Sequence, residues 1–305
     1  MSLHGWIILD KPLELGSTQA VSAVKRNLRE AGFNMKLKGG IKVGHGGTLD
    51  PLASGILPIA LGEATKLTGR MLDADKIYDF TIRFGAQTET LDLEGAVVAT
   101  SDMRPMAAEV ASVLNQFTGP IEQVPPAYSA LMIDGKRAYD RARAGEVVEM
   151  PSRSVTIHAL DLVDAGEDWA TLRAHVSKGT YIRSLARDIA LALGTCGHVT
   201  YLRRIKAGPF TLDTAISLDS LNEIGKGASL EHKLLPLEAG LVDIPALALT
   251  PDMARAVRQG RVLTGMPQSD GLYCAKLDDV PVALVKLEGG SATVERGFNL
   301  VDVAE

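Results

Sequence analysis

The chain has 305 residues, of which 46% are hydrophobic and 23% charged, as is usual for a globular protein. No apolar run approaches the roughly 20 residues that a membrane helix needs, and the N-terminus lacks the basic head and cleavage site of a signal peptide. The two cysteines lie far apart and neither a C-x-x-C nor an H-x-x-x-H pattern occurs, so we expect a protein of the reducing cytoplasm without structural zinc.

The first half of the chain shows alternating strand and helix patterns. In chain order we expect a strand at residues 5–10, a helix at 17–29, a loop at 33–48, an apolar run at 56–61, a helix at 63–72, a strand at 77–84 and a helix at 105–117. The strand at 77–84 has the clearest alternation, because every second residue from Tyr78 to Phe84 is aromatic or aliphatic.

The second half of the chain is richer in strand patterns. In chain order we expect strands at 153–163 and 171–177, a helix at 181–193, a strand at 199–205, a helix at 252–259 and short strands at 271–273, 280–287 and 293–297. Several strand patterns follow one another directly, which favours a mixed, largely antiparallel sheet flanked by helices, in the α+β class, over a doubly wound parallel sheet.

A domain boundary is indicated near residues 240–250, where Pro245 and Pro251 bracket an apolar stretch. The short strands beyond it suit a small C-terminal β-barrel. We therefore expect two domains, 1–245 and 246–305.

The net charge of −5 argues by itself against a nucleic-acid-binding protein, because the domains of such proteins are often basic. The basic residues, however, are concentrated in segments 24–45 and 173–206, where they far outnumber the acids. They are Lys25, Arg26, Arg29, Lys36, Lys38 and Lys42, then Arg173, Lys178, Arg183, Arg187, Arg203, Arg204 and Lys206. This asymmetry fits a basic face on an acidic body; the alternative is that both segments are ordinary solvated surfaces.

The segment that most strongly indicates chemistry is residues 44–58, Gly-His-Gly-Gly-Thr-Leu-Asp-Pro-Leu-Ala-Ser-Gly-Ile-Leu-Pro, which we call the glycine-rich segment. It lacks the lysine of a phosphate-binding P-loop, which makes a nucleotide kinase a distant alternative. Its glycines allow tight turns and close approach of a ligand, while Pro51 favours an extended conformation at Asp50. Asp50 is thus presented on a constrained loop; the plain alternative is that Asp-Pro simply begins a helix.

The glycine-rich segment resembles the catalytic motif of the TruB pseudouridine synthases, G-H-x-G-T-L-D-P-x-A-x-G-x-L, along nearly its whole length. Further segments match this family in the same order, namely residues 5–12, Lys76-Ile77-Tyr78, residues 177–185 and Tyr201-Leu202-Arg203-Arg204. The resemblance covers about residues 4–210. Residues 254–260 are more loosely similar to the small PUA-type RNA-binding barrel. The resemblance implies the pseudouridine synthase fold with a PUA-like barrel at its C-terminal end.

The resemblance also implies an enzyme that isomerises uridine 55 in the T-loop of tRNA to pseudouridine, a rearrangement that loses no atoms and needs no cofactor. Asp50 would be the nucleophile, Arg183 the cation that keeps it ionised, and Tyr78 the residue that lies against the base and manages the C5 proton. Such chemistry requires the nucleotide to be flipped out of the RNA. The other residues that the resemblance implies are His45 in the vacated RNA stack, Tyr181 and Leu202 at the uridine, and Lys11 as a support of the loop.

Plainer roles stay open for these residues. Tyr78 and Leu202 lie in strand patterns and would pack in a core, while His45 would be a loop histidine and Arg183 a surface ion pair. The implied partner is the T-arm of tRNA, with no membrane and no protein partner required, for a cytoplasmic monomer. The alternatives are a tRNA-binding folding chaperone without essential catalysis, or the subunit of a guide-RNA-dependent synthase.

One departure from the family pattern lies just after Asp-Lys-Pro. The family usually continues with x-Gly-x-Thr-Ser, whereas this chain has Leu13-Glu14-Leu15-Gly16-Ser17. Glu14 therefore stands where a glycine is expected, which calls the geometry of this loop into question but leaves Asp50 in place.

Overall fold

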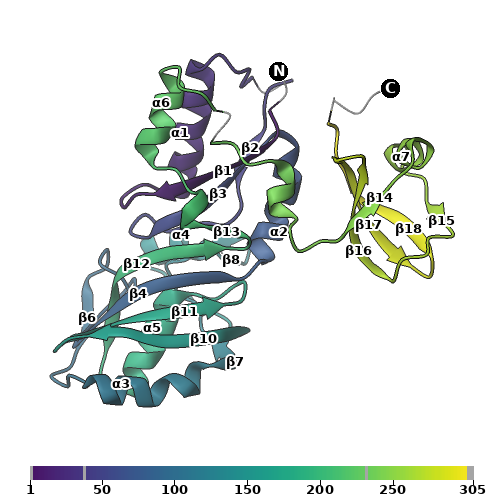
Figure 1. Cartoon of the computed structure of the whole chain (residues 1–305). Helices are drawn as coiled ribbons and strands as arrows, with labels where there is room; N and C mark the ends of the chain where they lie inside the picture. The colour runs from purple at the N-terminus through teal and green to yellow at the C-terminus, as the bar shows by residue number, and fades with distance from the viewer. Residues whose placement is uncertain (1–2, 37–38, 231–232, 301–305) are drawn as a thin grey trace.

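The computed structural model describes residues 3–36, 39–230 and 233–300, and its centre is a mixed sheet (Figure 1). Its strands are β1 (Gly5–Lys11), β2 (Val43–His45), β3 (Ser54–Leu61), β4 (Lys76–Phe84), β7 (Gly119–Gln123), β10 (Arg153–Ala165), β11 (Trp169–Val176), β12 (Gly197–Ala207) and β13 (Phe210–Thr211). The main order is β1-β3-β12-β4-β11-β10-β7, with β2 beside β3 and β13 beside β12. Among the described strands of this sheet, β3 and β12 form the one parallel pair, at Arg203↔Ser54 and Arg204↔Gly55.

Helices cover the sheet in two groups. They are α1 (Ser17–Glu30), α2 (Thr68–Asp73), α3 (Ala107–Val113), α4 (Ala138–Arg143), α5 (Ile182–Ala192) and α6 (Leu218–Gly225), with short 3-10 turns at η1 (Gly62–Leu67), η2 (Leu114–Phe117), η3 (Leu212–Thr214) and η4 (Leu237–Gly240). The apolar stripe of α1, with Ala20, Val24 and Leu28, packs with α6 on β1 and β3. Helix α5 packs instead with α3 and η2 on β4, β10 and β11. The active-site segments described below meet where these two cores adjoin, because Tyr78 packs against both.

A second sheet follows residue 245. Its strands are β14 (Ala246–Ala248), β15 (Leu263–Thr264), β16 (Gly271–Leu277), β17 (Val280–Glu288) and β18 (Ser291–Gly297), in the order β14-β16-β17-β18-β15, with α7 (Pro251–Arg258) against them. This curled five-stranded sheet lies to one side of the larger one (Figure 1) and is compatible with a small PUA-like barrel. The α+β class with a mixed, largely antiparallel sheet is thereby confirmed, while the division at residues 245 and 246 stays a prediction.

The two sheets share a hydrophobic core. Cys274, Leu284 and Phe298 lie in one buried cluster with Trp6 and Phe210, whose ring centroids are 5.2 Å apart. Lys66 of η1 also donates a hydrogen bond to the carbonyl of Gly297, at the end of β18. The body and the small sheet are therefore packed together.

Most elements lie where the sequence pattern predicts them. The predicted loop at 33–48, two residues of which are outside the described ones, is wrong at its end, since β2 pairs there with β3. The patterns also missed two small hairpins, β5 (Ala86–Thr88) with β6 (Val97–Thr100) and β8 (Met132–Ile133) with β9 (Lys136–Arg137). Such short hairpins carry too few residues for a readable period.

The two cysteines, Cys196 and Cys274, are buried and unpaired in the described structure, and burial raises the pKa of the Cys274 thiol to about 11. Within the described residues, every helix falls short of the length and apolar character required to cross a bilayer.

Candidate active site

The glycine-rich segment forms β2, a turn that carries Asp50, and the beginning of β3. A buried arginine of the neighbouring strand β12 holds this turn. The Arg204 side chain, 1% exposed, donates hydrogen bonds to the carbonyls of Gly47 (3.0 Å), Thr48 (3.3 Å) and Ile56 (2.7 Å). Gly55 has a φ of +98°, and a Cβ there would collide with the backbone of Arg204. Glycine is therefore required where the segment turns back against β12.

Two further contacts fix the flanks of Asp50. On one side, the hydroxyl of Ser17, the first residue of α1, accepts a hydrogen bond from the N–H of Leu49 and lies 2.8 Å from the carbonyl of the same residue. On the other side, the Lys11 ammonium donates to the carbonyls of Leu15 (2.6 Å) and Pro51 (3.3 Å). Burial lowers the pKa of Lys11 to about 8, against the opposing effect of Asp50. Lys11 thus contacts both the loop after β1 and the residue that follows Asp50; its predicted role as a support of the loop stays a prediction.

Asp50 is paired with a buried guanidinium. Its Oδ2 atom lies 2.9 Å from Nη2 of Arg183, which is on the first turn of α5. The Asp50 side chain is 41% exposed, whereas that of Arg183 is only 7% exposed. The pair therefore presents a carboxylate to solvent while its cation stays inside.

Arg183 is held by three other groups. It donates hydrogen bonds to the carbonyls of Thr90 (2.8 Å) and Tyr128 (3.0 Å), and Asp92 lies 3.3 Å from its Nη1 atom. Asp92 is itself buried and accepts a bond from the hydroxyl of Thr90. Four acceptors thus fix one guanidinium, so its fork is rigidly aimed at Asp50.

An open cavity of about 380 Å³ is lined by Asp50 and four of the other predicted site residues. Tyr78, Tyr181 and Leu202 line it together with Asp50 and Arg183. The structure thus brings together side chains from β4, β12 and the beginning of α5, which are far apart in the sequence. Tyr78 is half-buried at the end of the apolar row of β4, so its ring packs in the core and also faces the cavity. Its hydroxyl lies 3.5 Å from Nη1 of Arg204.

Tyr181 and His45 occupy different surroundings. Tyr181 immediately precedes α5, and the guanidinium of Arg153 lies 4.7 Å from the centre of its ring, within cation–π range. His45, on β2, is not among the residues lining the cavity. Burial, and then the nearby charge of Arg204, lower the pKa of His45, and its Nδ1 has no hydrogen-bond partner among the described residues.

The expectation that Arg204 belongs to a basic face of the protein is wrong. Arg204 is buried and holds the turn that carries Asp50. Successive side chains of β12 alternate in direction, so Arg204 points inward, whereas Nη2 of Arg203 lies 2.7 Å from Oδ2 of Asp10. Asp92 is a further residue of the site that the sequence patterns do not predict. No motif marks this residue, and only the fold brings it against Arg183. In the first of the two basic segments, every described basic residue is exposed, whereas Lys38 lies outside the described residues.

Solved structures with the same architecture include an H/ACA RNP bound to a substrate RNA containing 2'-deoxyuridine. It aligns with a TM-score of 0.72 at 25% identity, covering 98% of this chain and 86% of that one. A Cbf5-Nop10-Gar1 complex aligns with a TM-score of 0.72 at 26% identity, covering 97% and 85%. The fold is therefore that of the pseudouridine synthases.

Family models and relatives narrow this class. Residues 33–182 match the TruB family pseudouridylate synthase N-terminal domain, and residues 183–242 match the tRNA pseudouridylate synthase B C-terminal domain. The chain is 70% identical to a tRNA pseudouridine synthase B of Novosphingobium aromaticivorans, over 99% of this chain and 100% of the relative. It is 59% identical to another from Zymomonas mobilis, over 98% and 97%. This chain belongs to the TruB family of pseudouridine synthases, which are isomerases.

Proposed function

We propose that the protein converts uridine 55 in the T-loop of tRNA to pseudouridine, with Asp50 as nucleophile. Asp50 initiates the reaction by attacking C1′, by abstracting the 2′-proton or by adding to C6 of the base. In each case the carboxylate must be ionised and accessible. The product contains every atom of the substrate, so the reaction needs no cofactor.

One observation carries this proposal. The partly exposed carboxylate of Asp50 is paired at 2.9 Å with buried Arg183, in a cavity that Tyr78, Tyr181 and Leu202 also line. If Asp50 merely capped a helix, its arginine partner would not need a second buried acid. Arg183 has such a second acid in Asp92. The names of the relatives, tRNA pseudouridine synthase B, support tRNA as the substrate.

The cavity accepts a nucleotide only after that nucleotide leaves the RNA stack. Tyr78 lies against the base with its hydroxyl available for the C5 proton, Leu202 forms an apolar wall, and Tyr181 contacts the base or ribose. His45, outside the cavity lining, fills the space left in the RNA stack.

The proposal extends to the domains, the RNA partner, the oligomeric state and the compartment of the protein. Residues 1–245 form the catalytic domain and 246–305 a PUA-like RNA-binding domain, and the protein acts on the T-arm as a monomer without a protein partner. The cytoplasm, where tRNA is processed, is the expected compartment.

Incubation with unmodified tRNA, followed by mapping of pseudouridine, tests the proposal. We expect modification at position 55, none in a transcript with cytidine at that position, and none with an Asp50→Asn variant. Asn keeps the size of the side chain but removes its charge, so tRNA binding by that variant should stay within about threefold of wild type, well under the tenfold that about 1.4 kcal/mol represents. Modification elsewhere, or an active Asp50→Asn protein, contradicts the proposal.

The same experiment separates the alternatives. A chaperone without essential catalysis would leave the RNA unmodified at every protein concentration. A guide-RNA-dependent subunit would modify it only after a guide RNA and protein partners are added, as the assemblies in the related structures suggest.

A further inference from the structure

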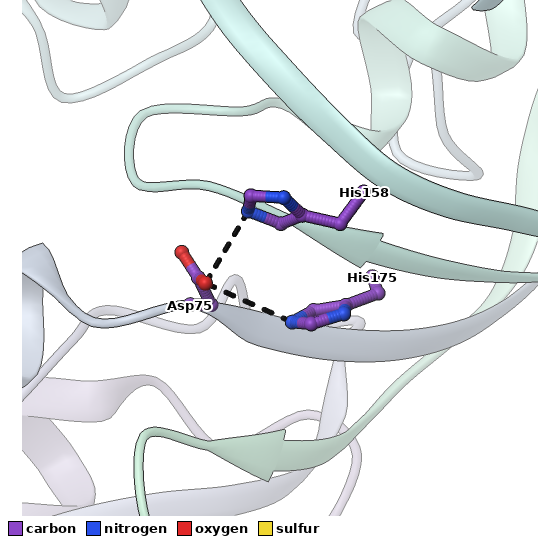
Figure 2. Close-up of side chains that lie close together, drawn as sticks. All are labelled: Asp75, His158 and His175. Atoms are coloured by element: carbon purple, nitrogen blue, oxygen red, sulfur yellow. Dashed lines mark ion pairs between the residues drawn. The ribbon is translucent and has the colours of Figure 1, made fainter. Parts of the chain in front are cut away.

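A group of three side chains outside the cavity lining has no part in the proposed reaction. Asp75, His158 and His175 point toward one another next to the beginning of β4 (Figure 2). Oδ2 of Asp75 lies 3.3 Å from Nε2 of His158 and 3.8 Å from Nε2 of His175. The two imidazole rings are 4.7 Å apart between centroids.

The register of the sheet explains why residues so distant in sequence meet. His175 of β11 pairs with Ala159 of β10, while the preceding pair is Ile157 with Val176, so His158 is the extra residue of a β-bulge. A bulge places two residues opposite one, which brings His158 to the face that carries His175. Asp75 directly precedes Lys76, which pairs with Val176, so its carboxylate reaches the same face.

The donor set and its spacing suit a metal ion. Two imidazole nitrogens and one carboxylate oxygen are a common protein ligand set for Zn²⁺, with a fourth position left for water. Ligand atoms about 2.0–2.1 Å from a tetrahedral metal are separated from one another by about 3.3 Å. The separations of 3.3 and 3.8 Å from Asp75 are close to that value, and all three ligand atoms lie within 4.8 Å of one another.

The exposure of the group also permits binding. The side chains of Asp75 (49% exposed) and His175 (37%) face an open hollow, so an ion can enter. Lys206 lines the same hollow, and its positive charge opposes the binding of a cation there.

We propose that Asp75, His158 and His175 form a binding site for a divalent transition-metal ion of the Zn²⁺ type. Bound metal would tie the beginning of β4 to β10 and β11. Tyr78 lies three residues after Asp75, and the segment that leads to Tyr181 follows His175. The bound metal would therefore lie close in sequence to both tyrosines.

Titration of the tag-free, metal-stripped full-length protein with Zn²⁺ against a chromogenic chelator tests the site. We expect one equivalent to bind and the thermal midpoint to rise with Zn²⁺. Co²⁺ should give the intense visible absorption of a tetrahedral site. His158→Ala, His175→Ala and Asp75→Asn should each weaken binding by more than about tenfold, the loss that removal of even an outer partner can produce.

Two variants in the same hollow serve as matched controls. Asp73→Asn removes a carboxylate that is paired with Lys178 and should leave the affinity within about threefold, because it supplies no ligand. Lys206→Gln removes the adverse charge and should tighten binding. Absence of binding by wild type, or equal binding by the His158→Ala/His175→Ala double variant whose circular dichroism is unchanged, overturns the proposal.

Discussion

At the scale of single residues, Arg183 is the centre of the site. A planar guanidinium can satisfy two carboxylates and two carbonyls at once, as it does with Asp50, Asp92, Thr90 and Tyr128. An ammonium is a point charge with a different geometry, so lysine cannot replace it at this position. The pairing with Asp92 also gives the buried cation a second carboxylate besides Asp50.

We therefore expect Arg183→Lys to lower kcat by about 100-fold, a loss of about 2.7 kcal/mol, with KM changed much less. Single-turnover kinetics on tRNA measures this, and Asp92→Asn should act in the same direction. Arg187→Lys is the matched control, since Arg187 lies one turn further along α5, bonds to Val124 and Asp188, and touches neither Asp50 nor Asp92. A kcat for Arg183→Lys within threefold of wild type would contradict this role.

At the scale of elements, the loop between β1 and α1 shows what the departure from the family pattern does. Glu14 has a φ of +65°, a conformation that suits the glycine usual at this position, and its N–H donates to the carbonyl of Pro51. The loop therefore keeps its shape with a strained residue. Gly16 is the N-cap of α1 and offers no side-chain cap, although its N–H donates to the side chain of Gln19 (2.7 Å).

Glu14→Gly should raise the free energy of unfolding by about 1 kcal/mol, because glycine adopts positive φ without a Cβ clash. Urea unfolding measures this change. Glu14→Ala is the control, since alanine keeps the Cβ and should bring no such gain. If both variants raise the free energy of unfolding equally, the charge of Glu14, and not its positive φ, destabilises the protein.

The sequence predicts helices and strands well where the apolar residues recur with a clear period. It predicts poorly those features that depend on how the strands pair in the folded chain. β4, α1 and α5 follow their periods, and the glycine-rich segment with Asp50 is visible because its residues are contiguous. Arg203 and Arg204 look alike in sequence, and only the pairing of β12 with β3 and β4 decides which one is buried. The bulge at His158 is likewise invisible, which is why the spacing of histidines predicted no metal site.

At the scale of the whole molecule, the charges are arranged unevenly despite the net charge of −5. In the second basic segment, Arg173, Arg187 and Arg203 are each paired with a carboxylate, and Arg183 and Arg204 are buried. In the first, Lys25 and Arg29 are exposed on α1, and within the described part of the chain neither forms an ion pair. The first segment is therefore the better candidate for contacts with the phosphates of tRNA.

Lys25→Gln/Arg29→Gln should weaken tRNA binding and lower the slope of log affinity against log salt by about 1.5, because each lost phosphate contact removes about 0.7–0.9. Filter binding between low and moderate salt measures this slope. Arg83→Gln is the control, since exposed Arg83 is already neutralised by Asp168. A slope equal to that of wild type would remove α1 from the RNA-binding face.

The burial of both cysteines has a practical consequence for experiments on this enzyme. Cys196 and Cys274 are shielded by the folded chain, and the high pKa of Cys274 keeps it as an unreactive thiol at neutral pH. Met132 is 60% exposed on β8, next to the residues 129–131 that line the active-site cavity. A fluorophore attached through Met132→Cys to the otherwise unaltered protein would therefore report, in real time, when an RNA arrives at the cavity.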